Sequence, residues 1–345
     1  MWWVGTRKGL FAVEDGEVRS APHFLGVPVT MVLVAGQTVY AALDHGHFGT
    51  KLHRSRDGGR SFVEVACPAF DEADQAAVQT VWALERGGDG RLWCGTIPGG
   101  LFTSDDDGDS WQLVRSLWER EERQEWFGGG ADEPGIHSVC IHPDDPQDVI
   151  VGISCGGVWR TRDGGVSWSL EGRGMRANFM PPEREGEPNI QDPHCVVRSP
   201  SHPDILWTQH HCGVWRSQDA GASWEERQVP PSSFGFPVAV HPRDPNIAWF
   251  VPAVADHCRV PVDGAVVVAR TRDGGASFEV LREGLPQEHA YDLVFRHALG
   301  LAPHGRELLM GSTTGSVWRS QDQGDRWRRV SAHLPPVYCV RWGGG

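Results

Sequence analysis

Short apolar runs separated by glycine- and proline-rich turns recur along the whole chain of 345 residues. The first run, WWVGTRKGLFAVE at residues 2–14, has the form of a strand, a turn and a second strand. Long apolar stripes with helical spacing are scarce, whereas the chain contains 43 glycines and 24 prolines. The pattern therefore predicts many short strands joined by tight turns, with little helix.

One eight-residue motif occurs six times, with the pattern Ser/Thr-x-Asp-x-Gly-x-Ser/Thr-aromatic. The sixth copy has Arg326 at the second hydroxyl position. The motif aspartates lie at positions 57, 106, 163, 219, 273 and 322, with gaps of 49, 57, 56, 54 and 49 residues. A repeat of this length suits one four-stranded propeller blade per copy.

The two ends of the chain predict a seventh blade. The segment VGTRKGLFAVEDGEV at 4–18 aligns with VGISCGGVWRTRDGG at 151–165, and PPVYCVRW at 335–342 has the form of an isolated first strand. Joining them gives an all-β, seven-bladed β-propeller, closed by a C-terminal strand 1 beside N-terminal strands 2 to 4, and this closure removes the exposed edges that an open sheet would carry. One domain at 1–345 is expected, with blades at 28–66, 79–116, 136–172, 193–228, 235–284, 288–331, and 337–342 plus 2–20.

The net charge and the cysteine content limit the kinds of binding partner and the cellular location that are expected. The formal net charge of −13 disfavours nucleic acid and anionic membranes, since both require a positive face. No apolar run approaches the ~20 residues of a membrane helix, and the N-terminus lacks the pattern of a secretion signal. The eight cysteines include no CxxC pair, so free thiols in a cytoplasmic protein are expected.

The repeated motif resembles the Asp-box of BNR-type propellers, and the resemblance covers essentially the whole chain. In this motif the aspartate accepts backbone hydrogen bonds, the glycine adopts positive φ, and the aromatic residue packs between sheets. The chain is similar to uncharacterised bacterial Asp-box propellers that carry sialidase-like or sortilin/WD40-YVTN-like labels. The arginine triad, the Tyr/Glu nucleophile pair and the Phe/Tyr-Arg-Ile-Pro motif of sialidases are not found, which argues against sialidase activity.

Aligning the innermost strands places a ring of side chains at the mouth of the central channel, opposite the Asp-boxes. The aligned strands begin HSVCIHP, HCVVRSP, FPVAVHP, YDLVFRH and YCVRW, and the two early blades offer Thr30 and Thr80. The ring residues predicted from the other blades are His137, His194, Phe236, Tyr291 and Tyr338.

The loops between strands 2 and 3 are expected to open on the same face. They carry Arg7, Lys8, Asp44, His45, His47, His210, His211, Asp256 and His257, while Glu288 and His289 directly precede Tyr291. Two connections, at 116–136 and 172–192, are much longer than the ~4–6 residues typical of loops. Long loops of this kind usually form walls or lids over a pocket.

Converging imidazoles predict a site for a divalent transition metal such as Zn, Fe, Cu or Mn. The preferred ligands are His137, His194 and His210 or His211, followed by His45, His47, His257 and His289. Glu288, Tyr291 and Tyr338 are candidates for acid–base or substrate contacts. Arg7 and Lys8 are candidates for holding an anionic group of the substrate, and Asp44, Phe236 and Asp256 for completing its site.

The favoured function is a hydrolase- or lyase-like enzyme acting on a small polar or saccharide-derived ligand. Three alternatives remain open from the sequence alone. The histidines can act without metal as general bases, with Tyr291 or Glu288 as the acid. They can simply line a water-filled channel, or the disc can be a non-catalytic module that presents its top face to a protein or peptide. A monomer is allowed, because a closed propeller needs no partner to cover its sheets.

Overall fold

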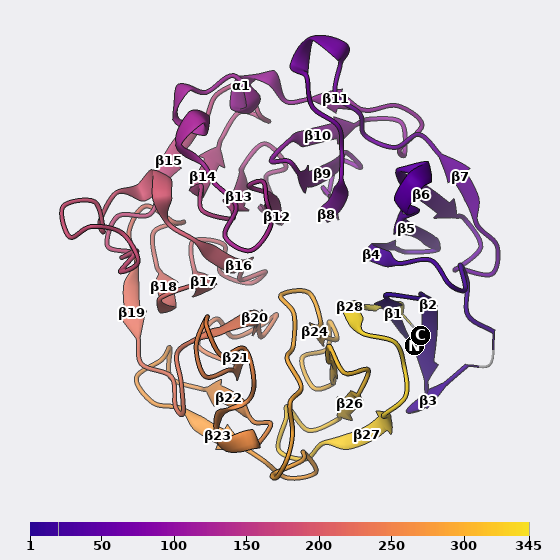
Figure 1. Ribbon diagram of the computed structural model, residues 1–345, viewed down its shortest axis with the longest axis vertical. Coiled ribbons are helices and arrows are strands. Elements are labelled where there is room, and N and C mark those ends of the chain that lie inside the picture. The colour runs from indigo at the N-terminus through magenta and orange to yellow at the C-terminus, as the bar shows by residue number, and fades with distance from the viewer. Residues whose placement is uncertain (20, 345) are drawn as a thin grey trace.

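The computed structural model describes residues 1–19 and 21–344. Seven antiparallel sheets of four strands each lie around a central opening (Figure 1). The predicted all-β, seven-bladed propeller is therefore confirmed. Among the described residues, no helix combines the length and the apolar character needed to cross a membrane.

In six blades the strands follow the chain from the axis outward (Figure 1). The first three of these blades contain β4 (Val29–Ala35), β5 (Thr38–Asp44), β6 (Thr50–Ser55) and β7 (Val63–Val65); β8 (Thr80–Arg86), β9 (Leu92–Ile97), β10 (Leu101–Ser104) and β11 (Gln112–Leu113); and β12 (Ile136–Ile141), β13 (Val149–Ile153), β14 (Gly157–Thr161) and β15 (Ser169–Glu171). The next three contain β16 (Pro193–Arg198), β17 (Leu206–His210), β18 (Gly213–Ser217) and β19 (Glu225–Arg227); β20 (Gly235–Val240), β21 (Ala248–Pro252), β22 (Val268–Thr271) and β23 (Glu279–Leu281); and β24 (Leu299–Leu301), β25 (Leu308–Gly311), β26 (Val317–Ser320) and β27 (Arg328–Ser331).

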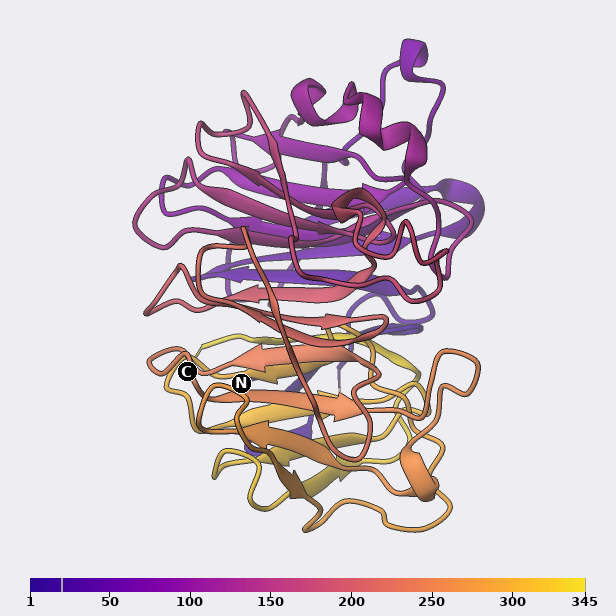
Figure 2. The ribbon, with the colours of Figure 1, turned by 90° about the vertical axis from the view of Figure 1, so that its left-hand side faces the viewer.

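The seventh blade joins the two ends of the chain. Its strands are β28 (Val337–Trp342), β1 (Trp2–Thr6), β2 (Gly9–Glu14) and β3 (Glu17–Val18), in that order from the axis. Any Cβ at Gly5 would lie 2.6 Å from the Sγ of Cys339, so the close approach of β1 to β28 requires glycine there. Both termini lie together on one side of the disc, and the short helices of the long loops lie on the other (Figure 2).

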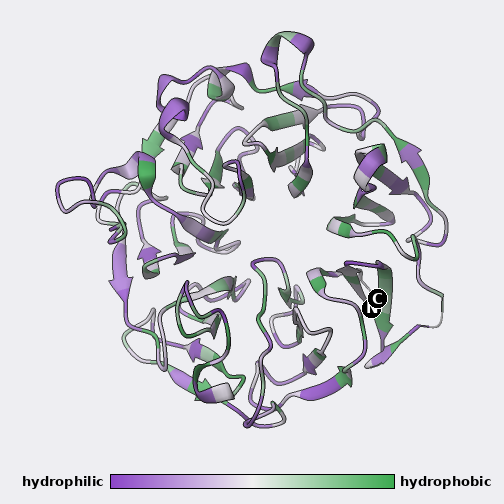
Figure 3. Ribbon diagram, viewed as in Figure 1, coloured by the Kyte–Doolittle hydropathy of each residue, from purple (hydrophilic) through white to green (hydrophobic). Residues whose placement is uncertain are grey.

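Apolar side chains fill the space between neighbouring blades. Trp93 and Trp159, from two adjacent blades, belong to one fully buried cluster that also contains Val139. The outermost strands are shorter and more polar: β19 and β27, purple over much of their length in Figure 3, are rich in charged residues. Short charged edges discourage pairing with other chains. All eight cysteines are free thiols, as expected.

The six Asp-box motifs form tight turns with shared hydrogen bonds. In the third copy, Asp163 accepts hydrogen bonds from the Thr161 hydroxyl at 2.7 Å, the Ser167 N–H at 2.8 Å and the Ser167 hydroxyl at 2.6 Å. These hydrogen bonds lower the pKa of Asp163 to about 2, with the Ser167 hydroxyl as the largest cause. In the sixth copy Arg326 has no hydroxyl, and only its N–H reaches Asp322, at 3.0 Å.

A β-bulge interrupts the innermost strand of six blades close to the channel mouth. In each case the innermost strand has one residue more than its partner strand across the bulge, which shifts the register. The unpaired residues of the innermost strands are Thr30, Trp82, His137, His194, Phe236 with Pro237, and Tyr338. Bulges redirect side chains, and here they turn the mouth residues away from the regular alternation of the sheet.

The remaining blade departs from the expected alignment. The segment YDLVFRH at 291–297 was aligned as an innermost strand, but β24 begins only at Leu299. Residues 292–298 form an irregular connection whose ends are tied to β25 and its loop, through Leu293 to Thr313 and through Ala298 to Gly311. Tyr291 is left 64% exposed, outside the ring predicted for it, because this blade has no strand at that position.

Removing one Asp-box hydroxyl tests how these turns stabilise the fold. Ser167→Ala should raise the pKa of Asp163 and lower the stability of the protein. A carboxyl with a depressed folded pKa stabilises the fold above its ordinary pKa of about 4 and loses this contribution as pH falls toward 2. The stability difference from wild type should therefore be largest near neutral pH and shrink below about pH 4. Urea unfolding at several pH values measures it, with the exposed Ser201→Ala as control; a difference independent of pH contradicts this account.

Candidate functional site

Asp192, His194 and His211 form a compact cluster on the mouth side of the channel. Asp192 directly precedes β16, His194 is the bulge residue of β16, and His211 lies in the turn between β17 and β18. The Oδ2 atom of Asp192 lies 3.5 Å from the Nε2 of His194 and 3.3 Å from the Nδ1 of His211. Two imidazole nitrogens thus face the same carboxylate oxygen.

The other oxygen of Asp192 is held by the neighbouring blade. Its Oδ1 accepts hydrogen bonds from the backbone N–H of Cys155 at 3.1 Å and from the Ser154 hydroxyl at 3.3 Å. Burial by itself raises the pKa of Asp192, but its contacts with the imidazoles of His194 and His211 hold that pKa well below its usual range. Asp192 is therefore an ionised carboxylate with a fixed orientation.

The hydrogen bond on the far side of the His194 ring defines which nitrogen carries the proton. Nδ1 of His194 lies 2.6 Å from the carbonyl oxygen of Gly235, and a carbonyl can only accept. The Nδ1–H therefore donates to Gly235, and a neutral ring presents its Nε2 lone pair to Asp192. Such an arrangement requires a positive charge between Nε2 and Oδ2, which is either a proton or a metal ion.

The spacing of the three ligand atoms fits a metal site. Nitrogen and oxygen ligands at 2.0–2.2 Å from a tetrahedral zinc ion lie roughly 3.3–3.5 Å from each other. The two distances from Asp192 Oδ2 are 3.3 and 3.5 Å, and all three ligand atoms lie within 4.8 Å of one another. Two imidazoles and one carboxylate are the donor set of many zinc and non-haem iron sites, so this cluster could hold a divalent transition metal.

Aromatic rings enclose the two histidines. Phe236 stacks on His194 with ring centroids 4.5 Å apart and an angle of 10° between the planes. Phe234 meets both histidines edge-on at 5.7 and 5.9 Å, and Phe179 meets His211 at 5.0 Å. This apolar shell fixes the ring orientations and limits the access of water to the cluster.

The two long connections form a wall over the cluster. The first contains α1 (Arg115–Trp118) and η3 (Glu121–Glu125), and the second contains η4 (Pro188–Ile190). They are joined by a hydrogen bond of 2.9 Å from Trp126 Nε1 to Asn189 Oδ1. A Cβ at Gly129, in the first connection, would lie 3.0 Å from Asp192 Oδ2, Cys155 Sγ and Ser154 Oγ. The backbone at Gly129 therefore closes directly over Asp192.

A cavity of about 370 Å³ lies beside the cluster and contains part of the predicted site. His211 lines it together with Asn178, Phe234, Asp256 and His257. Asp256 and His257 were predicted as substrate and metal contacts, and the structure brings both to the cavity that adjoins the cluster. Asp256 is also paired with Arg259, which lowers its pKa against the opposing effect of partial burial.

Two of the preferred ligands, His137 and His210, do not join the cluster. His137 is fully buried in the neighbouring blade, with its Nδ1 at 2.8 Å from the Ser138 hydroxyl. The ring nitrogens of His210 each lie 3.0 Å from a backbone N–H, Nε2 from that of Asp192 and Nδ1 from that of Cys212. His210 thus supports the backbone of the cluster rather than its ligand shell.

The other predicted residues lie in two further places. Arg7, Asp44 and Tyr338 line a separate cavity on the channel axis. Lys8, His47, Glu288, His289 and Tyr291 are exposed, His45 is half-buried, and none of the six belongs to the Asp192 cluster.

Asp192 and Arg296 were not predicted as site residues. Asp192 stands two residues before His194. Residues two apart in a strand point to the same face, and this spacing is the sequence feature that could have identified Asp192. Arg296 lies in the irregular connection before β24, where a strand had been expected, so its position on the channel axis had no signal in the alignment.

No protein-family model and no curated protein sequence matches this chain. Its fold is similar to the GH74 xyloglucanase from Xanthomonas campestris, with a TM-score of 0.68 and 16% identity over 96% of this chain and 52% of that one. An ancestral GH74 enzyme gives a TM-score of 0.61 at 16% identity, over 92% of this chain and 37% of that one. This chain thus spans about half, or less, of the length of these two proteins.

The structure of YCF48 bound to D1 peptide gives a TM-score of 0.56 at 15% identity, over 88% of this chain and 82% of that one. YCF48 from Cyanidioschyzon merolae gives 0.55 at 14% identity, over 89% and 87% of the two chains. At these identities the similarity extends to the fold alone. The chain therefore shares its propeller architecture both with glycoside hydrolases and with a peptide-bound protein.

Proposed function

We propose that this protein is a metal-dependent, hydrolase- or lyase-like enzyme that acts on a small polar or saccharide-derived substrate. The metal is held by Asp192, His194 and His211. The observation that carries the proposal is the orientation of His194, whose Nδ1–H is committed to the Gly235 carbonyl while Nε2 faces a buried carboxylate. A metal ion between these atoms satisfies the lone pairs of both.

The residues around the cluster would suit metal-assisted catalysis. A divalent metal in such a site acts as a Lewis acid and lowers the pKa of bound water. Asp192 and His194 are anchored by the backbones of two neighbouring blades, and His211 borders the cavity. Asn178, Asp256 and His257 offer an amide, a carboxylate and an imidazole for orienting the polar groups of a substrate there.

The same site can also work without a metal, with a proton on His194 Nε2 in place of the metal ion. His194 is then an imidazolium paired with Asp192, in the manner of an acid–base pair oriented by a carboxylate. The cavity and the orienting residues are the same in both versions, so metal content distinguishes them.

A second candidate function is a non-catalytic module that binds a protein or peptide on the mouth face. Phe127 and Phe179, from the two long connections, are 37% and 39% exposed and contact each other edge-on at 6.4 Å. An exposed aromatic pair beside a cavity favours such binding. The YCF48 propeller, solved with a bound D1 peptide, offers a precedent for the fold.

Elemental analysis of the purified protein tests the metal site. Wild-type protein loaded with Zn²⁺ or Fe²⁺ and then dialysed should retain about one ion per chain. Asp192→Asn and His211→Ala should each lower the affinity by about 10–100-fold or more, because the first replaces a charged carboxylate with a neutral amide and the second removes an imidazole ligand. His333→Ala, an exposed histidine outside the cluster, should bind as wild type does.

The opposite results discriminate among the alternatives. Absence of metal from loaded wild-type protein overturns the metal site and leaves the acid–base pair or the binding module. Equal retention by wild type and Asp192→Asn shows that metal binds elsewhere, which also contradicts the proposal.

Gly129→Ala tests whether the wall over Asp192 shapes the site. The added methyl group would lie 3.0 Å from Asp192 Oδ2 and two neighbouring atoms, so the loop must move outward. Overpacking of this kind should cost about 1–3 kcal/mol of stability and weaken metal retention. Gly186→Ala is the matched control, since a Cβ at Gly186 meets no atom within 4 Å. Equal stability and metal retention in the two variants, measured by urea unfolding and elemental analysis, would mean that the wall does not press on the cluster.

A further inference from the structure

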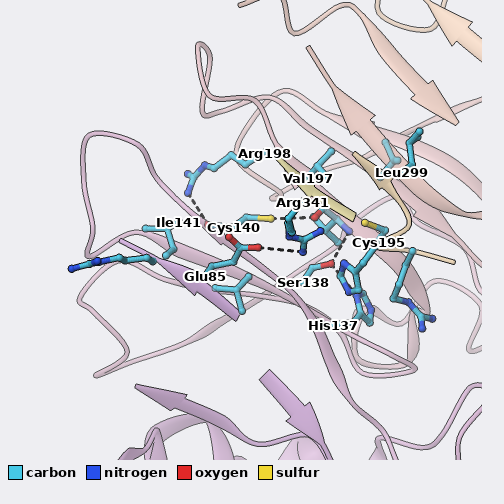
Figure 4. Close-up of a pocket in the computed structure, with 16 residues that line it drawn as sticks. Glu85, His137, Ser138, Cys140, Ile141, Cys195, Val197, Arg198, Leu299 and Arg341 are labelled. Atoms are coloured by element: carbon cyan, nitrogen blue, oxygen red, sulfur yellow. Dashed lines mark hydrogen bonds and ion pairs between the residues drawn. The ribbon is translucent and has the colours of Figure 1, made fainter. Parts of the chain in front are cut away.

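The channel axis contains two cavities that the metal cluster does not use. The wider one, of about 620 Å³, is lined by Arg7, Asp44, Trp82 and Tyr338 among others. The deeper one, of about 370 Å³, is lined by residues that include Glu85, His137 and Arg341 (Figure 4). Arg296 and His297 line both cavities and so form the narrow part of the channel between them.

The side chain of Arg296 is held across this narrow part. Its Nε donates a hydrogen bond of 2.7 Å to the carbonyl oxygen of His194. Its guanidinium lies over the ring of Trp82, 4.2 Å from the centroid, and 5.7 Å from the centroid of Phe236. Contacts with three blades therefore fix the group, and its Nη1–Nη2 end has no hydrogen-bond partner among the described residues.

Arg296 also lacks a carboxylate partner within ion-pair distance in the described part of the chain. Asp192, the carboxylate that most favours its charge, is already engaged by two histidines. An arginine guanidinium carries a positive charge at neutral pH. Further down the channel Arg341 has a carboxylate nearby, Glu85, at 3.7 Å. The protein has a net charge of −13, yet the positive charge of Arg296 in the channel has no carboxylate partner. Because an uncompensated charge in such a place is costly, we expect the site to receive an anionic ligand.

His137 supplies a second donor in the same region. The Ser138 hydroxyl oxygen accepts a hydrogen bond of 2.9 Å from the Val196 N–H and lies 2.8 Å from His137 Nδ1. In the tautomer in which this hydroxyl donates to Nδ1, the neutral imidazole carries its proton on Nε2. His137 is fully buried, its Nε2 has no partner, and its ring meets Trp82 edge-on at 5.6 Å. Both donors therefore pack against the same indole.

We infer that the narrow part of the channel binds the carboxylate of a small organic acid. The free Nη1–Nη2 end of Arg296 matches the two oxygens of a carboxylate, and the Nε2–H of His137 provides a further hydrogen bond. The wider cavity, with Trp82 and Tyr338 in its wall, accommodates the organic body of the ligand. This site is separate from the metal cluster and does not depend on the proposed catalytic function.

Calorimetric titration with matched acids and neutral analogues tests the inference. The probes are glucuronate beside glucose, and benzoate beside benzamide. At least one acid should bind wild-type protein about tenfold or more tightly than its neutral counterpart, in keeping with the strength of a charge-assisted hydrogen bond. Acid binding should persist after the metal is chelated with EDTA, with at most a modest change in affinity through the contact between Arg296 and His194, which shows that the metal does not hold the acid.

Variants of Arg296 locate the binding. Arg296→Met should weaken acid binding by about 10–100-fold, and Arg296→Lys, which keeps the charge but loses the planar fork, should weaken it less. Arg243→Met is the matched control, because Arg243 also donates to a single carbonyl, that of His304, but is exposed outside the channel. Circular dichroism checks folding, and the comparison rests on Arg296→Lys if the Met variant does not fold.

Three results would overturn the inference. In the first, neither acid binds the wild-type protein more tightly than its neutral analogue. In the second, folded Arg296 variants bind the acids as tightly as Arg243→Met does. In the third, inorganic phosphate binds as tightly as the better acid, which would make the channel a general oxyanion site rather than a site for organic acids.

Discussion

The pairing of β28 with β1 is the constraint on which the rest of the molecule depends. A ring of sheets buries its blade-to-blade faces only if the first and last blades also meet, and here one blade is built from both ends of the chain. The buried clusters on each side of this blade contain residues from the N-terminal strands and from the C-terminal strand alike. Closure thereby makes the stacking of every blade mutually dependent, and it fixes the radius at which the innermost strands face one another.

The residues of the candidate metal cluster lie at irregular positions of this ring. The bulge in β16 carries His194, the turn after β17 carries His211, and the residue before β16 is Asp192. All three belong to one blade, whereas the groups that orient Asp192 and His194 come from the neighbouring blades, through Cys155 and Gly235. The arrangement places ligands on one unit and their orienting contacts on adjacent units, so that the geometry of the site depends on how the blades stack.

The sequence was sufficient for the architecture because the Asp-box repeat carries both the period and the turn chemistry, and because the two chain ends complement each other. The site was only partly accessible to the same reasoning. His194 and His211 were identified, since they stand at aligned blade positions, but alignment could not show that His210 turns toward the backbone of Asp192 and Cys212. The alignment also could not locate Arg296. In its blade the innermost strand begins only at Leu299, and Arg296 lies in the irregular segment before it. Side-chain direction at bulges and turns depends on tertiary contacts, which a repeat pattern does not contain.

The hydrogen bond from Arg296 to the carbonyl of His194 joins two regions that otherwise have separate linings. The imidazole of His194 faces Asp192, and the backbone carbonyl oxygen of the same residue accepts the hydrogen bond from Arg296 on the channel axis. Any occupant that displaces Arg296 therefore also acts on the peptide group that positions the imidazole. Thermodynamic linkage requires such an effect to be reciprocal, so a metal ion in the cluster would alter the affinity of the channel for its ligand by the same factor. If both proposed sites are occupied, this single contact is the route by which one would affect the other.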